Sequence, residues 1–460
     1  MKKVFRDPVY NLIFFDKAED LLLLKLIDTY EFQRLRRIRQ LGVSWLTYPT
    51  AVHTRFSHSL GVAYLAGEIF DRLNLKDKIE FEDEDGLYEL KRNELKLLLK
   101  TTALLHDIGH GPFSHAFEEV IGQKHEKWSK EIIMNENSSI NRIIVEDDEI
   151  LNKAVPLEIR KKFPKWIGDI LDGLFPLRYI NEIISSQMDA DRFDYLLRDA
   201  YMCGVDYAKF DLEWILNNIK VAQIPHEDNR DGIVLNAEKG IYSIESFIVS
   251  RYHMYEQVYF HKTTRGAEKL IQLIFKRIKE LIEGNEINRI GPIDNVIVSI
   301  FDEKLNMRNY LKLDDFLVIT YINKWAFESN DDILKHLCRN FIARKLFKLV
   351  DTIDNAQLFT HQQYKNFEKF FKERNLEMKY YFIEDDYIDV PYKDDYLFGK
   401  KRSEDSGHIW LLDKNNKLIE LAEASDIIKS LRNNLNIKYR GYCDRSVYED
   451  FIKIVKGGVS

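Results

Sequence analysis

Residues 104–115 read LLHDIGHGPFSH, and this stretch decides which fold the chain can adopt. Leucines at helical spacing lead up to it: Leu95, Leu98, Leu99 and Leu105. The next two residues are His106 and Asp107. Neighbouring side chains on a helix diverge by about 100°, so this pair can face one ion only near a helix end. The glycines and the proline of the following GHGP supply such an end. We therefore expect a mainly helical protein in which one helix stops at a metal site.

Two other stretches bring further candidate ligands to this site. His58 lies in TRFSHSLGV and Asp191 lies in QMDADRFDYLLRD. A lone His-Asp pair is commonly an exposed pair or a capped helix end. Here, however, five of the twelve histidines gather around these motifs: His58, His106, His110, His115 and His125. Imidazoles and carboxylates together suit a divalent ion such as Mn²⁺, Fe²⁺ or Mg²⁺. Because no thiolate takes part, a structural zinc site is less expected.

Length and composition limit the class of protein. A chain of 460 residues exceeds one usual hydrophobic core, so we expect a helical core over 1–290 and a smaller mixed helix-and-strand lobe over 291–460. The 75 acidic residues outnumber the 68 Lys and Arg, which makes nucleic acid an unlikely partner. The three cysteines lie far apart, as expected for free thiols in a cytoplasmic protein. No apolar run is long enough for a membrane span, and the start does not resemble a signal peptide.

Strand patterns appear mainly near the C-terminus. Residues 379–392 and 408–421 are rich in aromatic and β-branched residues, with Asn415-Asn416 where a turn belongs. Earlier in the chain, IPHEDNRDG at 224–232 predicts the tip of a hairpin.

Three polar stripes follow helical spacing. The first comprises Asp191, Tyr195 and Asp199, and it points toward the metal set because Asp191 belongs to that set. The second comprises Arg251, Tyr255, Tyr259 and Lys262, whose cations suit a phosphate chain and whose tyrosines suit a sugar or base. The third comprises Gln33, Arg36 and Gln40, on a helix opened by Asp28 or Thr29. The second and third stripes could equally be solvated helix faces.

In this order, the motifs resemble those of the HD-domain deoxynucleoside triphosphate (dNTP) triphosphohydrolases, which include bacterial dGTP-activated enzymes and the vertebrate SAM-and-HD-domain enzyme. The resemblance runs from KVFRDP at residue 3 through IDTYEFQRLRRIRQLG, HTRFSHSLGVAYLAG, LLHDIGHGPFSHAFE, KHE and DADRFDYLLRDA to VYFHK at 258–262. No SAM domain is expected, since KVFRDP stands at the start. The resemblance implies an HD-type helical catalytic core.

The resemblance also implies roles for individual residues. The metal ligands are His58, His106, Asp107 and Asp191. The substrate contacts are Gln40, Leu41, Arg55, His110, His115, Arg192, Tyr195, Asp199, Arg251, Tyr259, His261 and Lys262. The catalytic group comprises His125, Glu118 and Glu126, together with His110 and His115. A regulatory guanine nucleotide would contact Lys3, Val4, Asp28, Gln33 and Arg36. The chain departs from the vertebrate pattern in having Glu118 for an aspartate, Arg6 for an asparagine and Tyr255 for a histidine.

The expected activity is metal-dependent hydrolysis of dNTPs to a deoxynucleoside and inorganic triphosphate, with Mg²⁺ accompanying the triphosphate. Activation by dGTP or GTP and a homotetramer, or otherwise a dimer, are expected with it. Two alternatives stay open from the residues alone. One is another HD phosphohydrolase that acts on an alarmone, a cyclic nucleotide or a nucleoside monophosphate. The other is a nucleotide sensor without catalysis.

Overall fold

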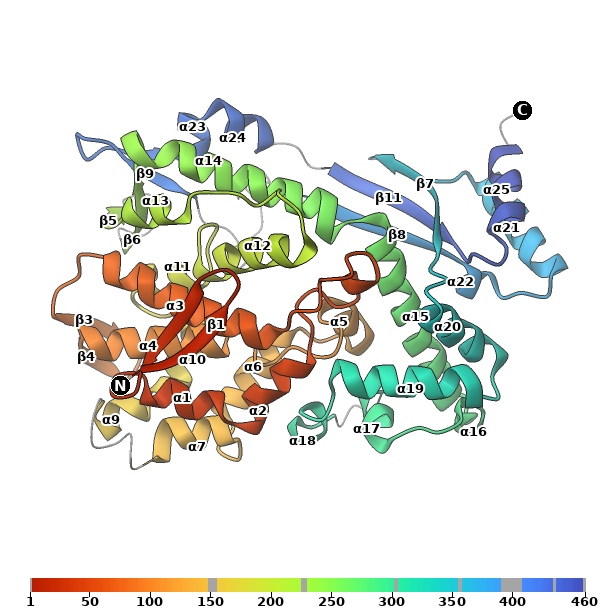
Figure 1. Cartoon of the computed structure of the whole chain (residues 1–460), viewed down its shortest axis with the longest axis horizontal. Coiled ribbons are helices and arrows are strands. Elements are labelled where there is room, and N and C mark those ends of the chain that lie inside the picture. The colour runs from red at the N-terminus through yellow and green to blue at the C-terminus, as the bar shows by residue number, and fades with distance from the viewer. Residues whose placement is uncertain are drawn as a thin grey trace.

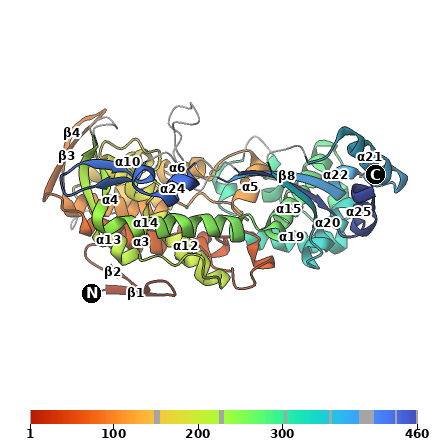
Figure 2. The same cartoon turned by 90° about the horizontal axis from the view of Figure 1, so that it is seen from above.

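Helices dominate the structure, as the leucine pattern predicts (Figure 1). The computed structural model describes residues 2–147, 155–224, 230–301, 305–354, 358–389, 408–432 and 436–457. The molecule is elongated, with most of the first half of the chain gathered at one end and helices α21 and α25 at the other (Figure 2). The long helix α15 (Lys262–Glu283) runs from the middle of the molecule into the second end (Figure 1).

Three long helices form the centre of the first end. Helix α3 (Arg55–Arg72) packs against α4 (Arg92–Leu105) and α12 (Ala190–Cys203). The helices around them are α1 (Leu21–Ile27), α2 (Tyr30–Gln33), α5 (His115–Ile121), α6 (His125–Met134), α7 (Ser139–Glu146), α9 (Leu157–Arg160), α10 (Phe163–Leu171), α11 (Arg178–Ile184), α13 (Leu212–Asn217) and α14 (Ala237–Met254). Three tighter or wider turns complete this part: η1 (Arg34–Arg37), η2 (Ser44–Leu46) and the π-turn η3 (Tyr255–Tyr259).

The second end combines helices with one antiparallel sheet. Its strands β7 (Lys348–Asp354), β11 (Asn436–Cys443) and β8 (Phe382–Asp389) are ordered β7-β11-β8. The helices and turn after α15 at this end are α16 (Ile287–Ile290), α17 (Asn295–Val298), η4 (Ser299–Phe301), α18 (Met307–Tyr310), α19 (Asp315–Glu328), α20 (Asp332–Ile342), α21 (His361–Glu373), α22 (Met378–Tyr381) and α25 (Tyr448–Gly457). Helices α23 (Leu421–Ala424) and α24 (Asp426–Leu431) instead lie beside α14 at the first end (Figure 1). The predicted mixture of helices and strands after residue 290 is confirmed.

Hairpins are more frequent in the first half than the sequence patterns predicted. The strands β1 (Lys2–Asp7) and β2 (Asn11–Asp16) pair, as do β3 (Lys78–Asp83) and β4 (Gly86–Lys91). The second of these turns contains Asp85-Gly86, a hairpin signal that the helical interpretation passed over; Gly86 has φ +135°. The predicted hairpin at 224–232 is present as β5 (Ile219–Ile224) and β6 (Arg230–Asn236), although its tip at 225–229 lies outside the described residues.

A C-terminal segment returns to the first end of the molecule. Strand β9 (Trp410–Leu412) pairs in parallel with β6 and antiparallel with β10 (Leu418–Glu420), around the predicted turn at Asn416. One hydrophobic cluster therefore contains both α3 and Leu411, whereas the other joins α15 to Phe113. Each cluster contains residues from both sides of residue 290 in the sequence. The division into domains at 1–290 and 291–460 therefore remains a proposal.

The expected helix over 27–42 is replaced by two short turns, α2 and η1. Thr29 begins α2 by accepting a hydrogen bond from the Phe32 amide. The fully buried Arg34 then turns inward and donates from Nε to Leu313 O (3.0 Å) and from its Nη atoms to Ile108 O (3.3 Å) and His110 O (2.7 Å). The apolar residues Phe32, Leu35 and Ile38 of this segment are all buried. A continuous helix gives way because Arg34 joins two distant loops.

Replacing Arg34 with methionine is expected to lower the free energy of unfolding by at least about 2 kcal/mol, because three buried carbonyls lose their donor. Denaturant unfolding followed by circular dichroism would measure the change. Arg36→Met is the control in the same turn, since Arg36 is exposed and should cost about 1 kcal/mol or less. Equal effects of the two substitutions would contradict this role of Arg34.

Candidate active site

The pair His106-Asp107 lies directly after the last residue of α4, as predicted. The Nδ1 of His106 lies 2.8 Å from Ala103 O, which leaves its Nε2 for the site. A Cβ at Gly109 would stand 2.2 Å from the backbone nitrogen of Ser129 and 2.3 Å from His125 O. Glycine is therefore required for this loop to lie against α6.

The four predicted metal ligands converge. His58 Nε2 lies 2.9 Å from Asp191 Oδ1 and 3.6 Å from Asp107 Oδ2. His106 Nε2 lies 3.5 Å from Asp191 Oδ1 and 3.4 Å from Asp107 Oδ1. Both Nε2 atoms are buried and make no hydrogen bond within the described part of the chain. The ligand atoms of His58, His106 and Asp191 lie close enough together to hold one ion, while Asp107 groups with His110 and His125 beside them. Buried imidazole nitrogens next to carboxylates fit a divalent metal.

A further carboxylate, Asp194, supports this set from behind, and the sequence analysis did not identify it. Its Oδ2 lies 2.8 Å from His58 Nδ1, while Arg198 donates to both of its oxygens at 2.9 Å. A Cβ on Gly61 in α3 would come within 1.9 Å of the Asp194 side chain, so α3 can carry no side chain at this position. Burial disfavours a charged imidazole, but the carboxylates of Asp191 and Asp194 outweigh it and raise the pKa of His58 to about 10. The surroundings of His58 thus favour positive charge.

A cavity of about 340 Å³ opens from the metal set. Predicted residues that line it are Gln40, Leu41, Arg55, Asp107, His110, His125, Asp191, Tyr195, Asp199 and Tyr259. The α12 stripe of Asp191, Tyr195 and Asp199 therefore faces the cavity. Tyr255 of the second stripe also lines it, together with residues that the sequence analysis did not propose: Gly42, Ser44, Phe113, Ser114, Phe260, Arg265 and Glu268. The size suits a small-molecule ligand.

Two histidines stack beside the metal set. The rings of His110 and His125 lie 3.6 Å apart and are nearly parallel, at 17°. His125 Nδ1 lies 2.7 Å from Glu118 Oε1 and 3.5 Å from Glu126 Oε2. Burial, together with the charges of Arg55 and His125, holds the pKa of His110 well below its usual value, so this ring is neutral. The side chain of His115 lies outside the described residues.

Asp199 and Tyr259, which also line the cavity, belong to a hydrogen-bonded group. The Tyr259 hydroxyl donates to Asp199 Oδ2 at 2.8 Å, and His53 Nε2 lies 2.7 Å from Asp199 Oδ1. Burial and the Asp199 carboxylate raise the pKa of Tyr259 well above its usual value, so the hydroxyl remains a donor. The buried Gln40 Oε1 has no hydrogen-bond partner among the described residues. His53 carried no sequence signal, because only the tertiary structure brings it to Asp199.

The stripe from Arg251 to Lys262 is not continuous. Helix α14 ends at Met254, the π-turn η3 follows, and Lys262 begins α15 after a break at Phe260 and His261. The predicted substrate contacts that do not line the cavity are Arg192, Arg251, His261 and Lys262. Arg192 donates to Ser186 O, and His261 accepts from the Thr263 amide. The guanidinium of Arg55, in contrast, lies at the cavity and pairs with Asp107 and Ser114.

The predicted regulatory residues lie on strand β1 and on the segment from Asp28 to Arg36. Lys3 and Val4 are on the exposed strand β1. Asp28 follows α1, and Arg36 Nε donates to Gln33 Oε1 at 2.9 Å while its guanidinium lies 3.5 Å from the centre of the Phe56 ring. Burial lowers the pKa of Arg36, and the Asp28 carboxylate opposes this.

Comparison with known proteins gives consistent similarities. An "HD domain" family model matches residues 55–199, and an "HD associated region" model matches residues 221–298. The uncharacterized protein YwfO of Bacillus subtilis is 36% identical over 98% of this chain and 94% of its own length. The human deoxynucleoside triphosphate triphosphohydrolase SAMHD1 is 30% identical over 76% of this chain and 55% of its own. The crystal structure of a phosphohydrolase from Bacteroides thetaiotaomicron superposes with a TM-score of 0.75 at 27% identity, covering 97% of this chain and 100% of that one.

Among the described helices, none is both long and apolar enough to cross a membrane.

His58→Ala is expected to weaken metal binding by more than about 100-fold, since losing a ligand costs more than losing a supporting residue. Metal content after gel filtration, measured by mass spectrometry, checks this. The helical circular dichroism spectrum should persist because α3 has its own apolar packing. His261→Ala, outside the cavity, should keep its metal. A His58→Ala protein with full metal content would refute the assignment.

Proposed function

The chain belongs to the HD-domain family of metallophosphohydrolases and is homologous to the SAMHD1 enzymes, and from this premise we propose that it is a dNTP triphosphohydrolase. In the proposed reaction, water attacks the α-phosphorus, the bond from that phosphorus to the 5′-oxygen breaks, and deoxynucleoside and inorganic triphosphate leave. The main support is one cavity whose lining brings together Asp107 and Asp191 of the His/Asp set, the stacked rings of His110 and His125, and the Tyr259–Asp199 pair.

His58, His106, Asp107 and Asp191 would hold the metal. We propose Mn²⁺, Fe²⁺ or Mg²⁺, since the donors are imidazoles and carboxylates without thiolates. A bound ion supplies Lewis acidity and lowers the pKa of water. Arg55 lies at this end of the cavity and would offset the negative charge of the triphosphate. Arg192, Arg251 and Lys262 remain proposed phosphate contacts on the resemblance, although they lie outside the lining.

We assign the general acid to His125. Glu118 holds Nδ1 of this ring, so Nε2 is the nitrogen available to carry a proton to the departing 5′-oxygen. The neutral His110 lies flat against the ring and fixes its plane. His115 is the alternative acid, and Glu126 is the alternative acidic partner at 3.5 Å.

The part of the cavity that is lined by Asp199 and Tyr259 would take the sugar. Asp199 and Gln40 present acceptors there, which suit the 3′-hydroxyl of a deoxyribose. The ring of Tyr259 would stand where a ribose carries its 2′-hydroxyl, and a packed aromatic wall rejects such an addition. Tyr195 lies beside it with its ring centre 6.1 Å away.

Regulation by dGTP or GTP is part of the proposal. Arg36 and Gln33 form a donor surface beside Asp28, whose carboxylate would accept from a guanine N1–H. Lys3 and Val4, exposed on β1, would contribute across a subunit interface in a homotetramer or a dimer. We also propose a cytoplasmic location, which suits the three buried free cysteines.

Product analysis tests the reaction directly. Incubation of the protein with dGTP and Mn²⁺ should yield deoxyguanosine and inorganic triphosphate in equal amounts by ion-exchange chromatography. Orthophosphate or pyrophosphate as the product would contradict the proposed reaction. Turnover of a cyclic nucleotide, an alarmone or a monophosphate, with dNTPs untouched, would favour a different HD phosphohydrolase.

His125→Ala should reduce kcat by about 10²–10⁴-fold while the metal stays bound, because a general acid is lost but no metal ligand is. Steady-state kinetics with a metal assay measure both quantities. Glu118→Gln should give a smaller loss, since it only orients the ring. A His125→Ala enzyme that changes KM alone would assign this histidine to binding instead.

Tyr259→Ala should raise the ratio of GTP to dGTP turnover about tenfold or more, because the wall beside the sugar is removed. Tyr259→Phe is the matched variant: it keeps the ring and the exclusion of GTP but loses the hydrogen bond to Asp199. If the alanine enzyme remains active on dGTP and still rejects GTP, Tyr259 does not select the sugar.

A further inference from the structure

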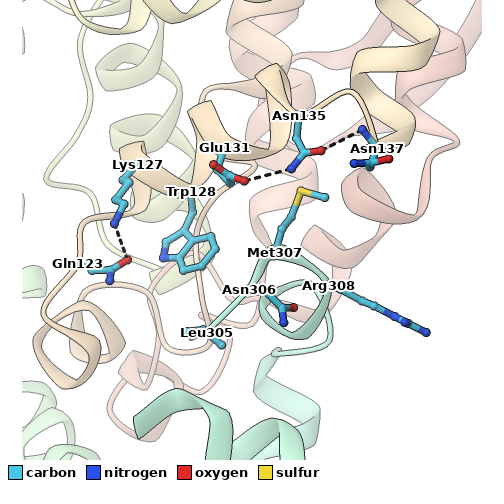
Figure 3. Close-up of a pocket in the computed structure, with 10 residues that line it drawn as sticks. All are labelled: Gln123, Lys127, Trp128, Glu131, Asn135, Asn137, Leu305, Asn306, Met307 and Arg308. Atoms are coloured by element: carbon cyan, nitrogen blue, oxygen red, sulfur yellow. Dashed lines mark hydrogen bonds between the residues drawn. The ribbon is translucent and has the colours of Figure 1, made fainter. Parts of the chain in front are cut away.

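A second cavity lies beside α6, and it shares no lining residue with the catalytic cavity (Figure 3). Its volume is about 530 Å³. The residues around it come from α6 with its flanking turns and from the turn that leads into α18: Gln123, Lys127, Trp128, Glu131, Asn135, Asn137, Leu305, Asn306, Met307 and Arg308. None of them belongs to the metal set, the catalytic cavity or the proposed guanine nucleotide site.

The indole of Trp128 has an unmet hydrogen-bond donor at this cavity. The side chain is 5% exposed, and its face stacks on Tyr310 with ring centres 3.9 Å apart. Its Nε1 is buried and has no hydrogen-bond partner among the described residues. Figure 3 shows the nitrogen edge turned to the side where Gln123 and Lys127 lie. A buried N–H of this kind calls for an acceptor.

The amide side chains of the cavity also present donors. Gln123 Oε1 accepts from Lys127 Nζ at 3.3 Å, and Asn306 Oδ1 accepts from the Asn309 amide at 3.0 Å. Both partners can only donate, so these contacts fix which end of each amide is the oxygen. The NH₂ groups of Gln123 and Asn306 remain for a ligand. Asn135 is already engaged at both ends, by Glu131 and by the Asn137 amide (Figure 3).

Lys127 supplies positive charge beside these donors and makes no ion pair within the described part of the chain, whereas the Arg308 side chain extends away from the other lining residues (Figure 3). Among the described lining residues the one carboxylate is that of Glu131, which accepts from Asn135 Nδ2 at 3.1 Å. A ligand that satisfies the site therefore has several acceptor oxygens and negative charge.

We propose that this cavity binds a phosphate-bearing anion, with Trp128 Nε1, Gln123 Nε2 and Lys127 Nζ as its donors. The shared chemistry is the phosphoryl group, either in inorganic polyphosphate or in a nucleotide ester. Leu305 and Met307 add apolar surface to the cavity, with Met307 on the side of Trp128 away from Gln123 and Lys127 (Figure 3). The site does not depend on the proposed reaction, because none of its residues takes part in that reaction.

The cavity wall is joined to the catalytic loop. Tyr310, on which Trp128 stacks, donates from its hydroxyl to Gly109 O at 2.5 Å. Ser129, the next residue along α6, accepts from the Gly109 amide and donates to His106 O. An anion bound to Trp128 would thus contact the helix that carries His125.

The test follows the indole ¹⁵N–¹H signal of Trp128 in the full chain by NMR, with Trp128→Phe identifying the signal. Sodium tripolyphosphate, deoxyadenosine monophosphate and, at matched ionic strength, sodium chloride are titrated separately. We expect a saturable downfield shift with at least one phosphate compound and none with chloride. The compound with the lower half-saturation distinguishes an inorganic source from an ester.

Lys127→Gln should raise the half-saturating concentration about tenfold, the effect of losing one charge-assisted hydrogen bond. Lys209→Gln is the matched control, since Lys209 is 73% exposed and far along the chain. The proposal is overturned if neither phosphate compound gives a saturable shift, if chloride gives the same shift, or if the two lysine variants behave alike. Because the readout is binding at Trp128, absence of dNTP hydrolysis would leave this result unaffected.

Discussion

The close approach of Gly109 to α6 is the constraint on which both cavities depend. With no side chain, this residue lets the loop after α4 lie directly on Ser129 and His125. Side chains then form hydrogen bonds with the polar backbone groups of the loop: Ser129 accepts from the Gly109 amide, and Tyr310 donates to the Gly109 carbonyl. Arg34 donates to the carbonyls on either side. A loop satisfied in this way is held in one conformation, which fixes where its histidines and Asp107 point.

Buried charges in the molecule are matched in pairs and chains. Arg198 joins Asp194 to Asp7 on β1, at 2.9 Å and 2.6 Å, so the N-terminal hairpin is tied to the helix that supports His58. The carboxylates raise the pKa of Arg198 above its ordinary value despite burial, because the partners remain charged inside the protein. Removing one member would leave an uncompensated buried charge, which is costly. The proposed metal set therefore rests on a prearranged electrostatic frame.

Helix α6 has two chemically different faces. One presents His125 to the catalytic cavity, where Glu118 holds the ring. The other presents Trp128 and Lys127 to an open cavity rich in donors. A single short helix thus borders the proposed reaction and the proposed anion site. A structural change at one cavity would reach the other through this helix, since Ser129 accepts a hydrogen bond directly from the Gly109 amide.

The sequence by itself determined the local features. Apolar spacing predicted α4, glycine and proline predicted its end, and the stripe Asp191, Tyr195 and Asp199 predicted one face of α12, because each depends on residues close in the chain. Tertiary structure alone decided contacts between distant segments: His53 with Asp199, Asp194 with His58, β9 with β6, and the break before Lys262. It also decided that 27–42 bends into two turns, since burying Arg34 against two remote loops outweighs helix propensity. Such pairings carry no periodic signal, and only the folded chain brings their partners together.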